Sequence, residues 1–274
     1  MRQASFDMKD NETKAGQAFS KQSFLFDTLN DENELSQYMR GIFRQEVLKY
    51  AKPQSAILEL NCGTGLDAFY FAEHGHSILA TDISKGMLQQ LEKKINDKNI
   101  HEKISTLHCS FHNIDAIQNK KFDHIISDFG GLNCTDNLRD VLLKFSPLLH
   151  DQGKVTLMIM PKICPWEIIT LLKGNRKIPF RRFKKNGTPA RVEGVEFLCY
   201  YYNPGYVIRT LKNEFEVLNV KGVCIVAPPE SQHNFPKRFP RLLSFLKKVD
   251  EAISNYFPFN RCCDHYVITL QKKQ

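Results

Sequence analysis

Two short segments combine the residue types that hold a nucleoside-containing cofactor. The first is the run from Glu59 to Gly65 (ELNCGTG), in which two glycines let the backbone turn sharply and pass close to a ligand. The second ends in Asp82, seventeen residues after Gly65, and its carboxylate can accept hydrogen bonds from both hydroxyls of a ribose. Together the segments predict a nucleoside-binding edge in an α/β protein.

The charges around the loop distinguish two cofactors that fit this spacing. Gly63, Gly65 and Ala68 satisfy the looser fingerprint of a dinucleotide-binding loop. A loop that holds a pyrophosphate avoids nearby acids, but here Glu59 precedes the loop and Asp67 follows it. Acids suit S-adenosylmethionine (SAM), which carries an ammonium and a sulfonium cation. We therefore expect SAM, with a nicotinamide dinucleotide as the alternative.

The elements that position these segments alternate between strand and helix patterns. Apolar runs predict strands, and apolar residues at helical spacing predict the helices between them. We expect strands at 56–60, 77–81, 104–109, 122–127 and 154–160, and helices at 36–48, 66–74, 84–95 and 137–149. Beyond Pro161 we expect helices at 204–215 and 242–256 and strands at 216–226 and 266–270. This alternation predicts a parallel sheet with helices on both faces.

Four segments then resemble the class I SAM-dependent methyltransferases. The run 59–65 is similar to motif I of that family. The segment 81–88 (TDISKGML) resembles the segment that follows the family's second strand, and 122–127 (FDHIIS) resembles its fourth strand. The segment 148–154 (LLHDQGK) resembles the approach to its fifth strand. The resemblance covers about residues 35–160 and is closest to the small-molecule group typified by quinone-biosynthesis methyltransferases.

The resemblance implies a fold and a set of cofactor contacts. The fold is a Rossmann-like, seven-stranded, mostly parallel sheet whose last two strands form an antiparallel hairpin. Many members carry an acid after the third strand to contact the adenine amine, but here Ser110 and Phe111 stand in that region. The implied cofactor-binding residues are Glu59, Asn61, Gly63, Gly65, Asp82, Ile83, Met87, Ser110, Phe111 and Ser127.

Candidate catalytic groups are less well defined. Asp128 follows the fourth strand and can act either as a base or as a cap of the next turn, and His112 is a second candidate base. Further candidates are His124, His265 and the tyrosines 200–202, although Asp264-His265 is expected to be structural. Arg40 can bind a cofactor carboxylate, but a solvated helix face is favoured. We expect no metal site.

Length and composition indicate one large domain. The chain has 274 residues, of which 1–34 are expected to form a flexible or helical leader, with 1–20 flexible. Residues 35–274 are expected to form one methyltransferase domain with insertions at about 164–202 and 227–261. These insertions are rich in aromatic residues, which would form either a lid over a partly apolar pocket or a small separate core.

Charge and cysteine usage limit the partners. The net charge is +8, and a basic cluster at 173–185 could contact RNA, a membrane or an anionic substrate, with RNA considered unlikely. The eight cysteines form no C-x-x-C pair, which predicts neither zinc nor disulfides and favours the cytoplasm. We find no signal peptide and no apolar run long enough to span a membrane.

The sequence therefore predicts a SAM-dependent methyltransferase for a small molecule. We expect O-methylation of an aromatic or lipid-like metabolite, with carbon or nitrogen open as the acceptor atom. The alternatives are a nicotinamide-dependent reductase, and a SAM-binding or RNA-associating protein without small-molecule turnover. The oligomeric state stays open.

Overall fold

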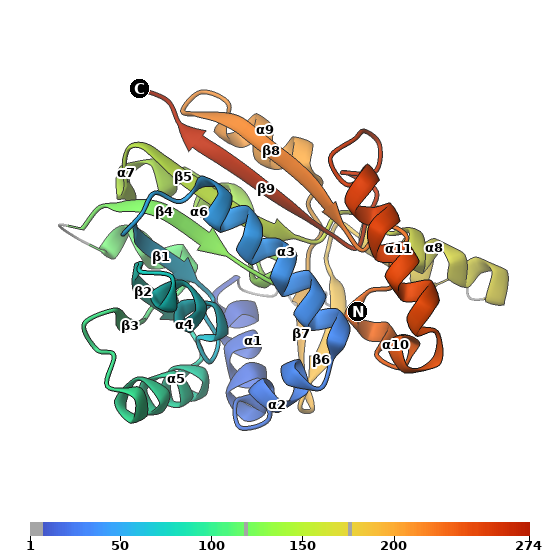
Figure 1. Ribbon diagram of the computed structural model, residues 1–274, viewed down its shortest axis with the longest axis horizontal. Coiled ribbons are helices and arrows are strands. Elements are labelled where there is room, and N and C mark those ends of the chain that lie inside the picture. The colour runs from blue at the N-terminus through green and yellow to red at the C-terminus, as the bar shows by residue number, and fades with distance from the viewer. Residues whose placement is uncertain (1–7, 118–119, 175–176) are drawn as a thin grey trace, which may run out of the picture.

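The computed structural model describes residues 8–117, 120–174 and 177–274, and a seven-stranded sheet runs through its centre (Figure 1). The strands of this sheet are β1 (Ala56–Leu60), β2 (Ser77–Asp82), β3 (Ile104–His108), β4 (Phe122–Ser127), β5 (Leu149–Ile159), β8 (Phe215–Val223) and β9 (His265–Lys272). Their order is β3-β2-β1-β4-β5-β9-β8. The first five are parallel, and β9 runs antiparallel to both β5 and β8, so the predicted fold class is confirmed.

Helices cover both faces of the sheet, as predicted. On one face, α3 (Glu34–Tyr50), α4 (Leu66–Glu73) and α5 (Lys85–Lys98) bury an apolar core that includes Met39, Phe71 and Leu91. On the other face, α6 (Leu138–Leu143), α7 (Phe145–Leu148), α9 (Pro204–Leu211) and the 3-10 helix η1 (Phe111–Ala116) bury a second core that includes Phe145 and Val207. The sheet is therefore the middle layer of three.

Local chemistry explains where these helices begin and break. The Ser84 side chain accepts the Met87 N–H at 3.2 Å and caps α5, as its position before the helix predicts. The predicted helix at 137–149 is interrupted between α6 and α7, because Pro147 has no N–H to continue the hydrogen-bond ladder. Strand β5 begins at Leu149, earlier than predicted.

The N-terminal segment differs from the sequence expectation. Residues 1–20 are expected to be flexible, but Met8–Gln22 form helix α1, while residues 1–7 lie outside the described part of the chain. Ala15 and Ala18 of α1 are buried, and Phe19 packs on Phe197 with ring centroids 5.9 Å apart. Small alanines give a weak hydrophobic period, so the contact face of α1 is hard to detect in the sequence. The short helix α2 (Phe26–Asp31) follows.

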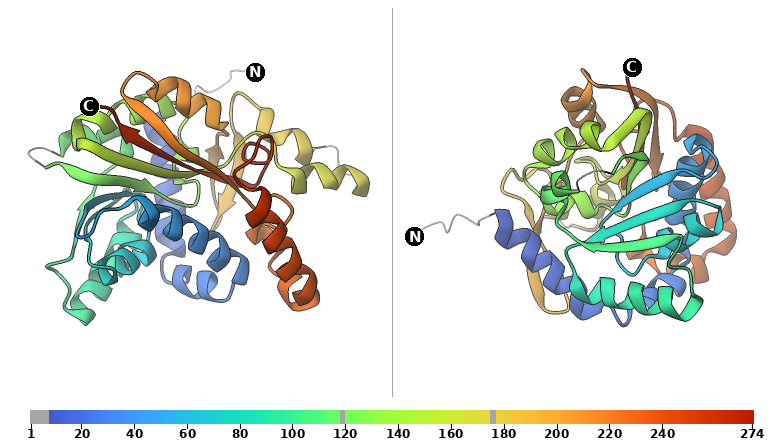
Figure 2. Two further views of the ribbon diagram at one scale, coloured as in Figure 1. Left: turned by 45° about the horizontal axis from the view of Figure 1, so that its top comes forward. Right: turned by 90° about the vertical axis from the view of Figure 1, so that its left-hand side faces the viewer.

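The two insertions form the remaining elements. The first holds α8 (Pro165–Ile168), the 3-10 helices η3 (Ile169–Lys173) and η4 (Ile178–Phe183), and a hairpin of β6 (Thr188–Val192) and β7 (Val195–Cys199). The second holds η5 (Glu230–Gln232), α10 (Phe235–Arg238) and α11 (Pro240–Ile253). A further 3-10 helix, η2 (Gly131–Cys134), follows β4. The left view of Figure 2 shows α8 and α11 at one end of the molecule, beyond the carboxyl end of β5 and the start of β9.

Within the described residues, no helix has the length and apolar character that crossing a membrane requires.

Candidate active site

The loop between β1 and α4 has left-handed backbone at three positions, two of them the glycines expected to let it turn sharply. The φ angles of Asn61, Gly63 and Gly65 are 51°, 54° and 81°. A β-carbon at Gly65 would lie 2.4 Å from Cδ1 of Leu91, so only glycine fits there. A β-carbon at Gly63 would meet nothing closer than the Phe26 ring, at 3.7 Å. The loop is therefore packed tightly on its protein side at Gly65 and less tightly at Gly63.

Asp82, at the end of β2, joins this loop to the start of α5. Its Oδ2 accepts the Gly63 N–H at 2.9 Å, and its Oδ1 accepts the Ser84 N–H at 2.7 Å. Burial raises the pKa of the Asp82 carboxyl to about 6. Each carboxylate oxygen keeps a further lone pair, which suits the hydroxyls of a ribose. The two segments singled out in the sequence thus meet at one edge of the sheet.

Helix α1 packs across the residues that follow Asp82. A β-carbon on Gly16 would lie 2.9 Å from the Ile83 side chain, so the helix backbone passes very close to it. The Ser20 and Ser84 hydroxyls are hydrogen-bonded at 2.8 Å. Met87 is fully buried just inside α5. The implied adenine-contacting region around Ile83 is therefore bordered by a helix that the sequence predicts to be flexible.

Glu12 of α1 is a buried acid beside Ser110 that the sequence reasoning did not single out. Its Oε2 accepts a hydrogen bond from the Ser110 hydroxyl at 2.5 Å, and Phe111 next to it is buried. Glu12 Oε1 is buried and has no partner within the described residues. Burial raises the pKa of the Glu12 carboxyl, against the lowering effect of Ser110. A carboxylate thus reaches Ser110 from 98 positions earlier in the chain, a distance over which no local pattern carries information.

Arg40 lies in a buried ion cluster beneath the loop. Its guanidinium donates to Asp67 at the start of α4, and to Oδ2 of Asp128 at 3.1 Å. Arg44 Nε donates to Asp67 Oδ1 at 2.6 Å. Arg40 is only 7% exposed, so the expectation that it lies on a solvated helix face is wrong. The sequence of α3 does not reveal this, because the partners of Arg40 come from other elements. The Asp67 carboxylate is paired with Arg40 and Arg44, so it presents no free charge to a cofactor, contrary to the expectation from the sequence.

The three acids of this cluster differ in how readily they ionise. Burial raises the pKa of Asp67, but Arg40 and Arg44 outweigh it and hold that pKa below its ordinary value. Burial and the neighbouring Asp67 charge raise the pKa values of Glu59 and Asp128 well above their ordinary range. Glu59 Oε2 is buried without a hydrogen-bond partner in the described part of the chain. The Asp67 carboxylate is therefore the fixed negative charge of the cluster.

The end of β4 lies against the loop after β1. Asn61 Nδ2 donates to the buried Ser127 hydroxyl at 2.6 Å. The Phe129 N–H donates to Asp128 Oδ1 at 2.6 Å, so Asp128 does cap the turn in which Phe129 and Gly130 have φ angles of 45° and 64°. Its contact with Arg40 and its raised pKa favour a positioning role. Its role as a base stays a prediction.

His112 lies between η1 and α6. Its Nε2 is 2.9 Å from the Thr135 hydroxyl, and its Nδ1 is 3.3 Å from Asp140 Oδ2. Both ring nitrogens are engaged, which favours a structural role, and its proposed catalytic role stays a prediction.

The Asp264–His265 pair opens β9 at the same edge of the sheet. His265 Nδ1 is 2.8 Å from Asp264 Oδ2, and a β-carbon on Gly130 would lie 3.4 Å from His265 Nε2. No hydrogen bond reaches Nε2 from the described residues. Arg182 donates to the Asp264 carboxylate at 2.7 Å, and Glu167 accepts from Arg182 at 2.6 Å. Although burial raises the pKa of Asp264, His265 and Arg182 hold it well below its ordinary value.

Helix α1 and the β6–β7 hairpin are fastened to the loop after β4. Asn133 Nδ2 donates to the Tyr200 carbonyl, and the Tyr200 N–H donates to the Asn133 main-chain carbonyl at 2.7 Å. Asn11 of α1 donates to the carbonyls of Cys134 and Leu198 at 2.7 and 3.1 Å. These bonds close part of the carboxyl edge with elements from the chain itself. We call α1 and the β6–β7 hairpin the roof of this edge. Phe197 in the hairpin is buried, as are Tyr201 and Tyr202 after it, whereas Phe180, Phe183 and Phe239 are exposed.

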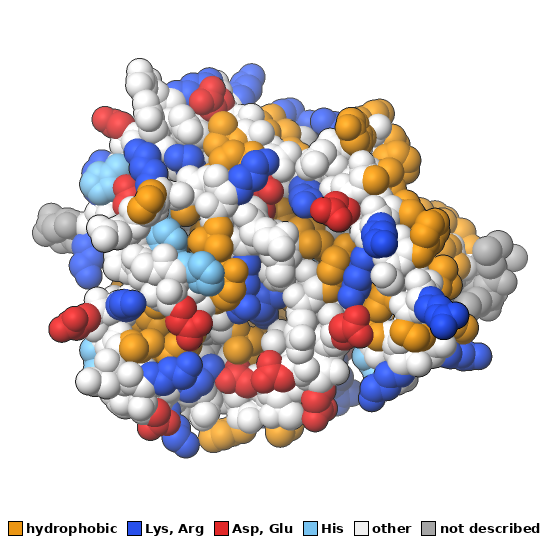
Figure 3. Space-filling model, in the orientation of Figure 1, with side chains coloured by type: hydrophobic (Ala, Val, Ile, Leu, Met, Phe, Trp, Pro, Cys, Tyr) orange, Lys and Arg blue, Asp and Glu red, His pale blue; other side chains and the backbone are white. Residues whose placement is uncertain are grey.

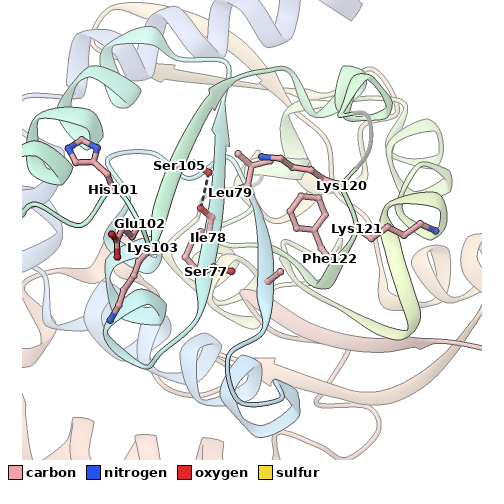
Figure 4. Close-up of a pocket in the computed structure, with 11 residues that line it drawn as sticks. Ser77, Ile78, Leu79, His101, Glu102, Lys103, Ser105, Lys120, Lys121 and Phe122 are labelled. Carbon is pink, nitrogen blue, oxygen red and sulfur yellow. Dashed lines mark hydrogen bonds between the residues drawn. The ribbon is translucent and has the colours of Figure 1, made fainter.

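A separate cavity of about 400 Å³ lies at the opposite edge of the sheet. It is bordered by Ser77, Ser105 and Phe122 near the amino ends of β2, β3 and β4, with Lys103 and Lys121 beside it (Figure 4). Since all the loops described above leave the carboxyl ends of the strands, this cavity belongs to a different surface.

Comparison with known proteins agrees with this geometry. Residues 57–153 match the family model described as "Methyltransferase domain". The chain is 28% identical over 223 residues to "Uncharacterized protein MJ1252" of Methanocaldococcus jannaschii, covering 78% of this chain and 83% of that protein.

Many solved structures are similar to this chain, and two of them illustrate the shared fold. One is the Burkholderia thailandensis 1,6-didemethyltoxoflavin-N1-methyltransferase, with a TM-score of 0.60, 14% identity and coverage of 100% of this chain and 94% of that chain. The other is an S-adenosylmethionine dependent methyltransferase from Mesorhizobium loti, with a TM-score of 0.55, 17% identity and coverage of 83% and 96%. The domain match confirms the predicted enzyme class, a SAM-dependent methyltransferase.

The buried ion cluster makes a prediction about stability. Replacing Arg40 with Met leaves Asp67 and Asp128 buried without their shared cation, so we expect the free energy of unfolding to fall by about 3–5 kcal/mol. Urea unfolding at neutral pH measures this loss, which should shrink on acidification because protonated carboxyls need no cation. Arg209→Met, on an exposed part of α9, is the matched control. An Arg40→Met variant as stable as its control would contradict the cluster's role.

Proposed function

We propose that this protein transfers the methyl group of SAM to a hydroxyl oxygen of a small aromatic or lipid-like molecule. The observation that carries the proposal is the Asp264–His265 pair, in which His265 Nε2 faces the loop after β4. Helix α1 and the β6–β7 hairpin are fastened to the end of the same loop and cover it. A covered site favours a small acceptor over a macromolecule. The quinone-biosynthesis-like group fits an acceptor of this kind and belongs to the same proposal.

The residues at the carboxyl edge fit the cofactor. Asp82 would hold the ribose hydroxyls, and Ile83 would pack on the adenine with Met87 and Phe111 behind it. Glu12 Oε1, an orphaned acceptor beside Ser110, fits an amine donor such as the exocyclic amine of adenine. The remaining proposed contacts are Gly63 and Gly65 for the methionine part, with Glu59, Asn61 and Ser127 around them.

The chemistry divides between the cofactor and the chain. When bound, SAM supplies an electrophilic methyl carbon whose bond to sulfur breaks as the acceptor oxygen attacks, and the bonding electron pair stays on sulfur. The chain positions the acceptor, and His265 Nε2 takes the hydroxyl proton. Asp264 fixes the ring through Nδ1 and stabilises the imidazolium, while Arg182 holds Asp264 in place.

The pKa of Asp82 predicts how cofactor binding depends on pH. Above about 6 the carboxyl is ionised and accepts from the ribose hydroxyls, whereas below it the protonated form accepts poorly. Calorimetry with S-adenosylhomocysteine should show affinity falling as the pH drops through about 6. Asp82→Asn should bind at least about tenfold more weakly at neutral pH. Asp97→Asn, on the exposed side of α5, is the control. Equal affinity in Asp82→Asn would contradict the assigned role.

Glu12 predicts a preference for the adenine amine. We expect Glu12→Gln to weaken S-adenosylhomocysteine binding by about tenfold or more, because a charged acceptor is lost. S-inosylhomocysteine carries a carbonyl oxygen in place of the amine, so it should bind the wild type poorly. The loss of affinity caused by Glu12→Gln should therefore be smaller for S-inosylhomocysteine than for S-adenosylhomocysteine. Asp10→Asn, exposed on the same helix, is the control. If the wild type binds S-adenosylhomocysteine and Glu12→Gln binds it equally well, only the Glu12 assignment fails.

His265 predicts how transfer depends on the acceptor. A panel of phenols, catechols and hydroxylated lipids is screened by release of S-adenosylhomocysteine. With a hydroxyl acceptor found this way, His265→Asn should lower kcat by about 100-fold, the usual contribution of a general base, with cofactor affinity unchanged. The loss should be smaller for acceptors whose hydroxyl is more acidic. Cofactor binding without turnover of any small acceptor would favour the non-catalytic alternative, and a His265→Asn variant of full activity would remove the proposed base.

A further inference from the structure

The positive charge of the chain is concentrated in its two insertions. Residues 164–202 and 227–261 together contain fourteen of the 38 Lys and Arg residues and six of the 30 Asp and Glu residues. Their excess of eight positive charges equals the net charge of the whole chain, which is +8. The rest of the protein is therefore neutral overall, and the insertions form a distinct electrostatic feature.

The same two insertions also contain most of the exposed apolar side chains. Of the seventeen large hydrophobic residues that are exposed among the described residues, eleven lie in these segments. They include Phe245, which is 61% exposed on α11, and Phe257, which is 74% exposed in the loop after it. Figure 3 shows hydrophobic side chains along the end of the molecule where Figure 1 places α8 and α11, with Lys and Arg among them. Large exposed apolar patches mark interaction surfaces.

Direct contacts join the two insertions into one end. Trp166 of α8 and Phe235 of α10 pack edge to face with ring centroids 6.1 Å apart. The N–H of Cys263 donates to the Ile163 carbonyl at 3.1 Å, which ties the end of the second insertion to the start of the first. Figure 1 and the left view of Figure 2 show α8 and α11 at the same end of the molecule. We call this surface the insertion end.

Cations and apolar groups alternate closely on the insertion end. The Arg238 guanidinium lies 5.2 Å from the centre of the Phe239 ring, and that of Arg261 lies 5.4 Å from the Phe257 ring. On α11, Leu242 and Phe245 are exposed one turn apart. Long basic side chains beside exposed aromatic and aliphatic groups suit an interface between hydrocarbon and a charged headgroup layer.

We propose that the insertion end docks on the surface of an anionic lipid membrane. Charge complementarity identifies the occupant: the basic side chains attract anionic headgroups, and the apolar side chains enter the headgroup–acyl boundary. Nucleic acid fits less well, because aliphatic groups such as Leu242 and Ile168 do not stack on bases. A protein partner also fits less well, since protein interfaces are depleted in lysine, and Lys184, Lys237 and Lys248 are exposed here.

The insertion end is directly connected to the proposed acceptor site. Arg182 and Glu167 come from the first insertion, and Arg182 donates to both the carboxylate and the carbonyl of Asp264 at 2.7 and 2.9 Å. Docking at this end would place the acceptor side of the sheet next to the membrane. A lipid-like acceptor would then reach the site without crossing water. The docking proposal itself does not depend on the identity of the acceptor.

Sedimentation of the full chain with sucrose-loaded vesicles tests the proposal. We expect binding to phosphatidylcholine vesicles that contain about 30% phosphatidylserine, and at least about tenfold weaker binding to pure phosphatidylcholine, with a strong dependence on salt. The double variant Leu242→Ser/Phe245→Ser should lower the partition coefficient by about tenfold or more. Its matched control is Phe24→Ser/Leu143→Ser, two exposed apolar residues outside the insertions.

A second pair of variants separates charge from apolar contact. Lys237→Gln/Arg241→Gln should weaken binding to anionic vesicles by about tenfold, whereas Lys93→Gln/Lys212→Gln, exposed elsewhere, should not. Circular dichroism melting verifies that all four double variants are folded. The proposal is overturned if the wild type does not sediment with anionic vesicles, or if the insertion-end variants bind as well as their controls. Binding of a polyuridylate probe without vesicle binding would identify the surface as a nucleic-acid site instead.

Discussion

The buried pairing of Arg40 with Asp67 is the constraint on which the cofactor edge depends. It connects α3 to the first turn of α4, and through Asp128 it also reaches the end of β4. These are the elements that carry the loop after β1 and the turn after β4. A charge in this position cannot be left alone, because an unpaired buried ion costs several kcal/mol. The three elements are therefore held in one arrangement before any ligand binds.

The proposed adenosine side depends on a different kind of contact. Here α1 comes from the N-terminus and supplies Glu12 to Ser110 and Ser20 to Ser84. Alanine and glycine on its packing face let the helix approach the sheet edge closely. The contact of Phe19 with Phe197 and a few polar bonds hold it there. It can complete the cofactor site while contributing less to overall stability than α3 does.

The difference between what the sequence predicts and what it misses follows from the range of the contacts. The loop after β1, the position of Asp82 and the alternation of strands and helices are written in residues close together in the chain, and these predictions hold. Glu12 and Ser110 are 98 positions apart, and Asp264 and Arg182 are 82 apart. Arg40 is misplaced for the same reason, since its helix gives no sign of the acids that face it. Side-chain contacts between residues far apart in the chain can be identified only once the fold is known.

The two insertions show how one set of residues can serve both a site and a surface. Inward-facing members such as Arg182 and Glu167 satisfy each other and hold Asp264, and they are therefore buried. Outward-facing members of the same segments, such as Phe180 and Phe183, are exposed. A lid needed only to shield a pocket would gain nothing from exposed phenylalanines beside lysines. Exposed phenylalanines gathered with lysines at one end are expected of a surface that binds another apolar surface.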